Sequence, residues 1–278
     1  RSRVRALLPL PNKINLIAGP INLIYESGLI KYLKAGNSEI LRMIYSAVRD
    51  ANWGTIPAQI EEEQITIEEQ AFVIKYKAVY KQDDIHFEAN YIIEGNPKGK
   101  IRFLMKGKSF SNFKKNRIGF CVLHPAAIAG YEIKVTHTDS SMETGLFPKL
   151  VSPHQPFKDI KTMQWSPADE LIANLTFSGD TFEMEDQRNW IDDSYKTYST
   201  PLNIPFPVEM KKGDIVEQEV VLQIFSNKEI PHESENDEIK FTINDDVTFP
   251  MPSIGIGRSS QVERLTAQEM EYLEKIRF

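Results

Sequence analysis

The feature that most constrains the fold of this chain is a repeated alternation of apolar and polar residues. It runs through 65–80 (ITIEEQAFVIKYKAVY), 85–93, 100–107, 171–179 and 215–226. A period of two residues is typical of a strand with one buried face. Polar turns such as Gln82-Asp83-Asp84 separate neighbouring segments, and successive strands with short turns pair antiparallel. The alternation therefore predicts a mainly β fold, a large antiparallel two-sheet β-sandwich over residues 1–250.

The segment 36–50 (GNSEILRMIYSAVRD) permits two interpretations. Asn37 or Ser38 could cap a helix, whereas RMIYSAV is rich in residues that favour strands. We favour a strand, because the neighbouring segments are strands.

The residues after 250 differ in character. SIGIG (253–257) is predicted to be a short buried strand, and Thr266 with Glu269 forms a capping box before a helix. The apolar stripe of this helix consists of Met270, Leu273 and Ile276. A strand followed by an amphipathic helix is the first half of a βαβ unit. We expect 251–278 to be the first strand and helix of a truncated α/β, TIM-barrel-like domain.

Charge and cysteine content limit the function and the location. The net charge of −6 argues against a nucleic-acid binder, which usually carries a basic face. No apolar run approaches the ~20 residues of a membrane span, and the start shows no signal-peptide pattern. The single cysteine, Cys121, excludes an intramolecular disulfide and fits a reducing compartment. We therefore expect a soluble, cytoplasmic protein without a nucleic-acid or membrane partner.

Residues 182–202 (FEMEDQRNWIDDSYKTYSTPL) combine carboxylates, amides, a guanidinium and aromatic rings. On a strand, Glu183 and Glu185 would share one face roughly 7 Å apart, and Asp186 would lie on the other. Two carboxylates on one face repel each other unless water, a cation or a ligand separates them.

This stretch has two interpretations. It is either a site for a sugar or a sugar acid, with planar polar groups for hydroxyls and rings for C–H faces, or a structural hydrogen-bond network that holds a long connection. If it is a site, Glu183 and Asp186 are its catalytic candidates. Its candidate substrate-binding residues are Arg188, Asn189, Trp190 and Tyr195.

The segment NRIGFCVLHP (116–125) supplies another catalytic candidate. Strand periodicity places Cys121 and His124 on opposite faces, so they cannot act together as nucleophile and base. Cys121, between Phe120 and Val122, is interpreted as core. His124 ends the apolar run, where it is either core or a catalytic group.

Two further clusters carry weaker signals. In VTHTDSS, His137 and Asp139 would share a face. They could act as a catalytic base and a substrate-orienting carboxylate, or as metal ligands. Arg49, Asp50 and Trp53 repeat the charged and aromatic chemistry, and we interpret them as a structural corner.

The sequence contains no GxSxG, P-loop, GxGxxG, HExxH or CxxC motif. Nucleotide, dinucleotide and serine-hydrolase functions therefore have no support, and neither a cofactor nor a metal is expected.

Several of these segments together resemble the N-terminal domain of the D-apionate lactonase family, bacterial sugar-acid catabolic enzymes with a β-rich domain ahead of a TIM-barrel-like domain. The resemblance extends from about residue 25 to the end of the chain. It rests on NRIGFCVLHP, HTD, FPKLVSPHQPF, GDTFEMEDQRNW, DSYKTYSTPL and LTAQEMEYLEKIRF. By strand count and length the β-domain is also similar to the supersandwich of aldose mutarotases, which is an analogy of fold only.

The resemblance implies a hydrolase that opens a small sugar-acid lactone without an obligatory nucleotide cofactor, and its own C-terminal barrel as a partner. In such a lactonase an Asp, Glu or His would activate water, and Arg188 or an amide would stabilise the oxyanion. Two alternatives remain: a non-catalytic carbohydrate-binding domain, and a mutarotase or epimerase acting on the sugar ring.

Overall fold

The computed structural model describes residues 13–226 and 266–275. The chain divides into two compact units, residues 1–234 and residues 235–278. The described part of the first unit is mainly β, as the alternation predicts, and that of the second is one helix.

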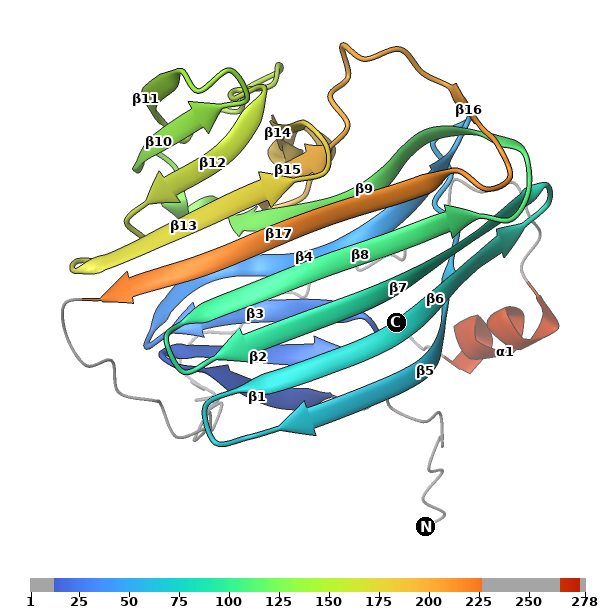
Figure 1. Ribbon diagram of the computed structural model, residues 1–278, viewed down its shortest axis with the longest axis horizontal. Coiled ribbons are helices and arrows are strands. Elements are labelled where there is room, and N and C mark those ends of the chain that lie inside the picture. Colours follow the sequence, from blue (N-terminus) through green and yellow to red (C-terminus); the bar gives the residue numbers. More distant parts are fainter. Residues whose placement is uncertain (1–12, 227–265, 276–278) are drawn as a thin grey trace. The chain divides into compact units, whose positions relative to one another are not determined.

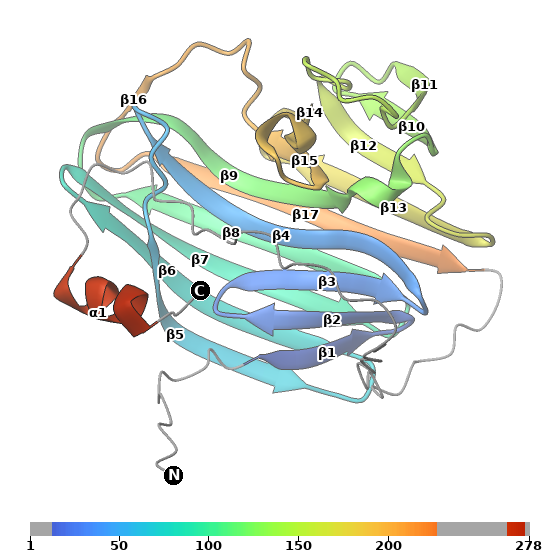
Figure 2. The same cartoon turned by 180° about the vertical axis from the view of Figure 1, so that it is seen from behind.

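The strands of the first unit pair antiparallel into one 17-stranded sheet that folds into two layers (Figures 1 and 2). In order of pairing, the first layer contains β5 (Ala58–Ile67), β6 (Phe72–Gln82), β7 (Ile85–Asn96), β8 (Lys100–Ser109), β17 (Ile215–Ser226) and β13 (Leu171–Ser178). The second contains β1 (Ile14–Ala18), β2 (Ile21–Glu26), β3 (Leu29–Ala35), β4 (Ser38–Asp50), β9 (Phe113–Pro125), β15 (Ser194–Ser199) and β14 (Phe182–Asp186).

A small set of strands joins the two layers at one end. They are β10 (Glu132–His137), β11 (Met142–Leu146) and β12 (Ile160–Trp165). β12 pairs with β13 along its length and meets β14 at the Ile160–Phe182 pair, so the hydrogen bonding continues from one layer to the other. The remaining elements are β16 (Val208–Met210), which pairs with β9, and the 3₁₀ helices η1 (Ala126–Ile128) and η2 (Gln187–Trp190).

The main core lies between the two layers, because each strand sends alternate side chains inward. In β7, Phe87, Ala89, Tyr91 and Ile93 are buried in turn. Tyr91 stacks on Tyr76 of β6 with ring centroids 4.7 Å apart. The two layers with a core between them confirm the β-sandwich that the period-two pattern predicts.

Two segments differ in detail from what the sequence predicts. Residues 65–80 form the end of β5 and the start of β6 rather than one strand. The polar residues between them turn the chain, and the Glu68 N–H donates to the Ala71 carbonyl at 2.8 Å. The segment 36–50 is a strand from Ser38 onward, as favoured over a helix, and Gly36 and Asn37 form the preceding turn.

The described part of the second unit is α1 (Ala267–Lys275), which confirms the predicted helix. The Met270 N–H donates to the Thr266 carbonyl at 3.0 Å. The strand expected at 253–257 and the stripe residue Ile276 lie outside the described residues, so the assignment of 251–278 to an α/β domain stays a prediction. No helix in the described ranges is long and apolar enough to cross a membrane.

Candidate functional site

The second layer carries a cavity on the face that points away from the main core. Alternation in β9 sends Val122 into the core, while Cys121 joins a separate small apolar cluster with Ala47 and Tyr198. The cavity on this face measures about 630 Å³. Its lining residues are Ala47, Arg49, Trp53, Arg117, Gly119, Cys121, Glu185, Gln187, Trp190, Lys196, Tyr198, Ser199, Leu202 and Phe206.

Strand register brings together a row of residues from distant parts of the sequence, of which Cys121 and Tyr198 line the cavity. Tyr45, Cys121, Tyr198 and Glu183 are successive neighbours across β4, β9, β15 and β14. The Tyr198 hydroxyl donates to Glu183 Oε1 at 2.6 Å, and the Leu202 N–H donates to the same oxygen at 2.7 Å. Glu183 is therefore a buried acceptor that holds Tyr198 and the following loop.

Next to this row, Glu185 and Lys196 form a half-buried ion pair across β14 and β15. The Gln187 amide also donates to Glu185. The two carboxylates predicted to share a face do so, and their repulsion is relieved differently. Glu185 is neutralised by a cation, whereas Glu183 accepts two hydrogen bonds.

Aromatic side chains form another wall of the cavity around Arg117. Its guanidinium lies 4.8 Å from the ring centroid of Phe206 and 5.8 Å from that of Trp53. The two rings themselves meet edge to face at 5.0 Å. Trp190 lies at the cavity as well and is 74% exposed. The cavity therefore offers apolar ring faces beside charged groups, a combination that suits a polar ligand with a C–H surface.

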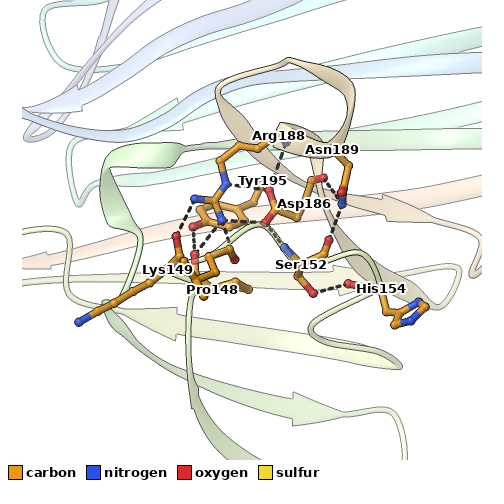
Figure 3. A network of polar contacts seen from close by, with 9 residues as sticks. Pro148, Lys149, Ser152, His154, Asp186, Arg188, Asn189 and Tyr195 are labelled. Atoms are coloured by element: carbon orange, nitrogen blue, oxygen red, sulfur yellow. Dashed lines mark hydrogen bonds and ion pairs between the residues drawn. The ribbon is translucent and has the colours of Figure 1, made fainter.

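Asp186 lies on the opposite face of β14 from Glu183, as strand periodicity predicts, and it organises a separate network (Figure 3). Asp186 is buried, caps η2, and receives the Arg188 guanidinium on both oxygens at 2.9 and 2.7 Å. The Ser152 N–H donates to it at 2.9 Å. Burial raises the pKa of Asp186, but these hydrogen bonds and the charge of Arg188 outweigh it and lower the pKa overall.

The same network fixes the loop at residues 148–152. The Arg188 guanidinium donates to the carbonyls of Pro148 and Lys149 at 2.8 and 3.2 Å, and the Asn189 amide donates to that of Ser152. The Tyr195 hydroxyl donates to the Pro148 carbonyl at 2.6 Å. All these groups satisfy the protein's own backbone, so this half of the stretch has the geometry of the structural network.

His124 lies in the core rather than at the cavity. Its Nε2 is 2.9 Å from Thr197 Oγ1, and the rings of Phe147 and Trp165 lie 6.0 and 5.6 Å away. Burial lowers the pKa of His124 to about 3, so its imidazole is neutral near pH 7. Burial likewise raises the pKa of the Cys121 thiol, which disfavours the thiolate.

No hydrogen bond or ion pair joins the side chains of His137 and Asp139. The ring of His137 contacts the Lys158 carbonyl at 2.8 Å and Glu143 at 3.3 Å. Asp139 accepts from the backbone and hydroxyl of Ser141 in an exposed turn. In the described ranges no group of three or more His, Cys, Asp and Glu residues could hold a metal ion.

The catalytic candidates Glu183, Asp186, His124 and His137 thus do not converge on one cleft. Among the substrate-binding candidates, Trp190 lines the cavity, while Arg188, Asn189 and Tyr195 belong to the network on the other face, and Asp139 lies in its own turn.

A family model described as the N-terminal domain of D-apionate lactonase matches residues 3–227. The chain belongs to the D-apionate lactonase family. It is 30% identical over 266 residues to the D-apionate lactonase of Brucella anthropi. The match covers 94% of this chain and 44% of that relative, so the chain spans less than half of the relative's length.

Solved structures agree with the D-apionate lactonase-family chain in fold alone. A protein from Synechocystis sp. PCC 6803 has a TM-score of 0.52 at 11% identity, covering 81% of this chain and all of that one. An Escherichia coli K12 protein assigned as an aldose 1-epimerase has a TM-score of 0.50 at 8% identity, covering 78% and 100%. The expected similarity to the mutarotase fold is confirmed.

The sequence did not point to several cavity residues of this D-apionate lactonase-family chain. The sequence indicates a structural corner at Arg49, Asp50 and Trp53, and Asp50 does form one, since it accepts the N–H groups of Asn52 and Gly54. Arg49 and Trp53 nevertheless line the cavity. Arg117 shares the strand face of Cys121, so period-two reasoning could have grouped them.

Proposed function

We propose that this chain is the N-terminal β-domain of a longer carbohydrate-catabolic hydrolase that opens a sugar-acid lactone to its open-chain acid. The observation that carries the proposal is the match of residues 3–227 to the N-terminal domain of D-apionate lactonase. The cavity supports it, because 630 Å³ is ample for a small sugar derivative.

In this proposal the cavity holds the sugar ligand. The rings of Trp53, Trp190 and Phe206 would pack on its C–H faces, and Gln187 with the Glu185–Lys196 pair would bind its hydroxyls.

We further propose that catalysis needs residues beyond this chain, with the C-terminal barrel domain as the partner that completes the site. Glu185, the acidic residue that lines the cavity, is paired with Lys196. Asp186 and His124 are engaged elsewhere. The relative from Brucella anthropi is more than twice as long as the matched part, which leaves room for such a domain.

The test compares the 278-residue chain with a protein that continues past residue 278. Proton release would be followed on a panel of sugar-acid lactones. We expect turnover by the longer protein and little or none by the chain alone. Trp190→Ala in the longer protein should raise KM several-fold with a small change in kcat, because a contact equal in ground and transition states affects binding only. No turnover by the longer protein would contradict the proposal, and robust turnover by the chain alone would move catalysis into the cavity.

The fold similarity to an aldose 1-epimerase favours one alternative, in which the cavity interconverts ring forms of a sugar. Polarimetry of freshly dissolved sugars would detect it, since mutarotation changes optical rotation without releasing acid. A second alternative is a carbohydrate-binding domain without a role in hydrolysis. It predicts that substitutions in the cavity abolish sugar binding, and that the longer protein with the same substitutions keeps its rate of lactone hydrolysis.

A further inference from the structure

Two arginines face each other across neighbouring strands in the cavity. Arg49 of β4 pairs directly with Arg117 of β9, and both side chains line the cavity. Side chains directly opposite in an antiparallel pair have Cβ atoms about 4.5–5.5 Å apart, and like charges at such positions destabilise the sheet.

These two residues differ from the other arginines of residues 13–226 in their partners. Arg42, Arg102 and Arg188 each lie within 4 Å of a carboxylate. Among the described residues, neither Arg49 nor Arg117 has a carboxylate at that distance. Arg49 donates to the Trp53 carbonyl at 3.3 Å and to the Thr55 hydroxyl. The two arginines of residues 13–226 without an ion pair are thus the two on directly paired strand positions.

Arg117 is also incompletely hydrogen-bonded. The residue is 5% exposed and donates to the carbonyls of Asn116, Pro201 and Ile204 at 2.7, 2.6 and 3.2 Å. A guanidinium has five N–H donors, and the buried Nε–H of Arg117 has no acceptor. Its guanidinium lies against the rings of Trp53 and Phe206 and is held by three carbonyls, so its position is set before any ligand arrives.

The acidic groups near this pair are already engaged. Glu185 is paired with Lys196, and Glu183 accepts from Tyr198 and the Leu202 N–H. Glu183 and Asp180 act on Arg117 only through longer-range attraction. The two guanidiniums therefore line the cavity with no carboxylate of the described residues at ion-pair distance, beside apolar rings.

We propose that Arg49 and Arg117 form a carboxylate-binding site and that the cavity prefers the open-chain sugar acid to the uncharged lactone. A carboxylate bound by the two guanidiniums would accept charge-assisted hydrogen bonds from them. The polyol chain of the acid would then lie against Trp53 and Phe206. Only the sugar identity of the ligand rests on the proposed function; the anion site rests on the arginine pair.

The test measures binding to the 278-residue chain by calorimetry with two matched pairs of probes, gluconate with glucitol and erythronate with erythritol. Within each pair the carbon chain and the hydroxyls match, and only the carboxylate is replaced by CH₂OH. We expect at least one acid to bind tenfold or more tightly than its polyol at low salt. Arg49→Gln should remove that preference. Arg42→Gln, a change in a surface ion pair, is the control and should keep the preference.

Equal binding of acid and polyol in both pairs, no binding of either acid, or a preference that survives Arg49→Gln would overturn the proposal. If inorganic phosphate competes as strongly as the acids, the pair is a general anion site and the sugar-acid assignment fails. Arg117→Gln should also remove the preference for the acid. If Arg117→Gln does not fold, because Arg117 is buried, the result for Arg49→Gln decides. Lactone turnover by the longer protein is a separate measurement, so failure here leaves the proposed function standing.

Discussion

The Arg188 guanidinium has the chemistry to bind a ligand carboxylate, but in this fold it stabilises the protein's own structure. A guanidinium beside amides and rings predicts carboxylate recognition. In the structure the carboxylate is the protein's own Asp186, and the remaining donors hold the loop at 148–152. The arginines that line the cavity are Arg49 and Arg117.

Arg188→Lys should therefore lower the free energy of unfolding by about 1–3 kcal/mol, because an ammonium cannot keep the two-point contact with a buried carboxylate and the loop carbonyls together. Thermal or urea unfolding would measure the loss, and gluconate binding should not change. The matched control is Arg42→Lys. The ion pair of Arg42 is partly exposed, so this change should alter the free energy of unfolding by less than about 0.5 kcal/mol. A binding defect without a loss of stability would contradict the structural role.

His124 should give the stability a pH dependence. Its pKa is about 3 in the folded protein and about 6.5 when unfolded. Between these values the unfolded chain binds more protons, so the free energy of unfolding falls as the pH decreases. The loss from this residue between pH 6.5 and 5 should be roughly 1–2 kcal/mol.

Urea unfolding at several pH values would test the role of His124. In His124→Phe the free energy of unfolding should depend less on pH between 6.5 and 5. In His154→Asn, a change at an exposed residue, the pH dependence should persist. An unchanged pH dependence in His124→Phe would show that other groups cause the loss of stability between pH 6.5 and 5. Buried Asp186, whose pKa is lowered, contributes stability at higher pH that is lost as the pH falls through its folded pKa, below this window.

At the scale of elements, the residue that caps the C-terminal end of η2 has an unfavourable backbone conformation. Ile191 adopts the left-handed conformation with φ of 64° and is fully exposed. A β-branched side chain is strained there, and no burial compensates for the strain.

Ile191→Gly should raise the free energy of unfolding by about 0.5–1 kcal/mol, since glycine adopts this conformation without a Cβ penalty although it gains entropy when unfolded. Ile191→Ala is the control, because it removes the exposed apolar surface and keeps the Cβ. Chemical denaturation would compare the three proteins. If alanine stabilises as much as glycine, backbone strain is not the cause.

At the scale of the whole molecule, the paired strands form a unit that ends before the last segment of the chain. Residues 1–234 make up one compact unit, and all 17 described strands lie within it. The core of this unit is built from its own side chains.

A protein of residues 1–234 should consequently fold by itself. We expect a circular dichroism spectrum dominated by β-structure, and a melting temperature within a few degrees of that of the 278-residue chain, because the main core remains complete. The same gluconate affinity is expected, since all cavity residues are retained. Aggregation or a spectrum without β-structure would show that residues 235–278 are needed for the fold.

Local pattern was sufficient to predict the β class, the strand at 38–50, the placement of Asp186 opposite Glu183 and of His124 opposite Cys121, and the family. Each of these depends on period-two alternation or on contiguous motifs, which involve residues close in sequence. The mutarotase-like fold could be expected only by analogy.

What only the tertiary structure decided was which face of each strand meets the core and which meets the cavity. Alternation distinguishes two faces but does not say what covers each. That depends on pairings between distant segments, such as β4 with β9 and β9 with β15. The opposition of Arg49 and Arg117 and the capture of Arg188 by Asp186 and the loop at 148–152 arise only once those segments are packed. A side chain's partners follow from long-range packing, and residue type and spacing alone cannot supply them.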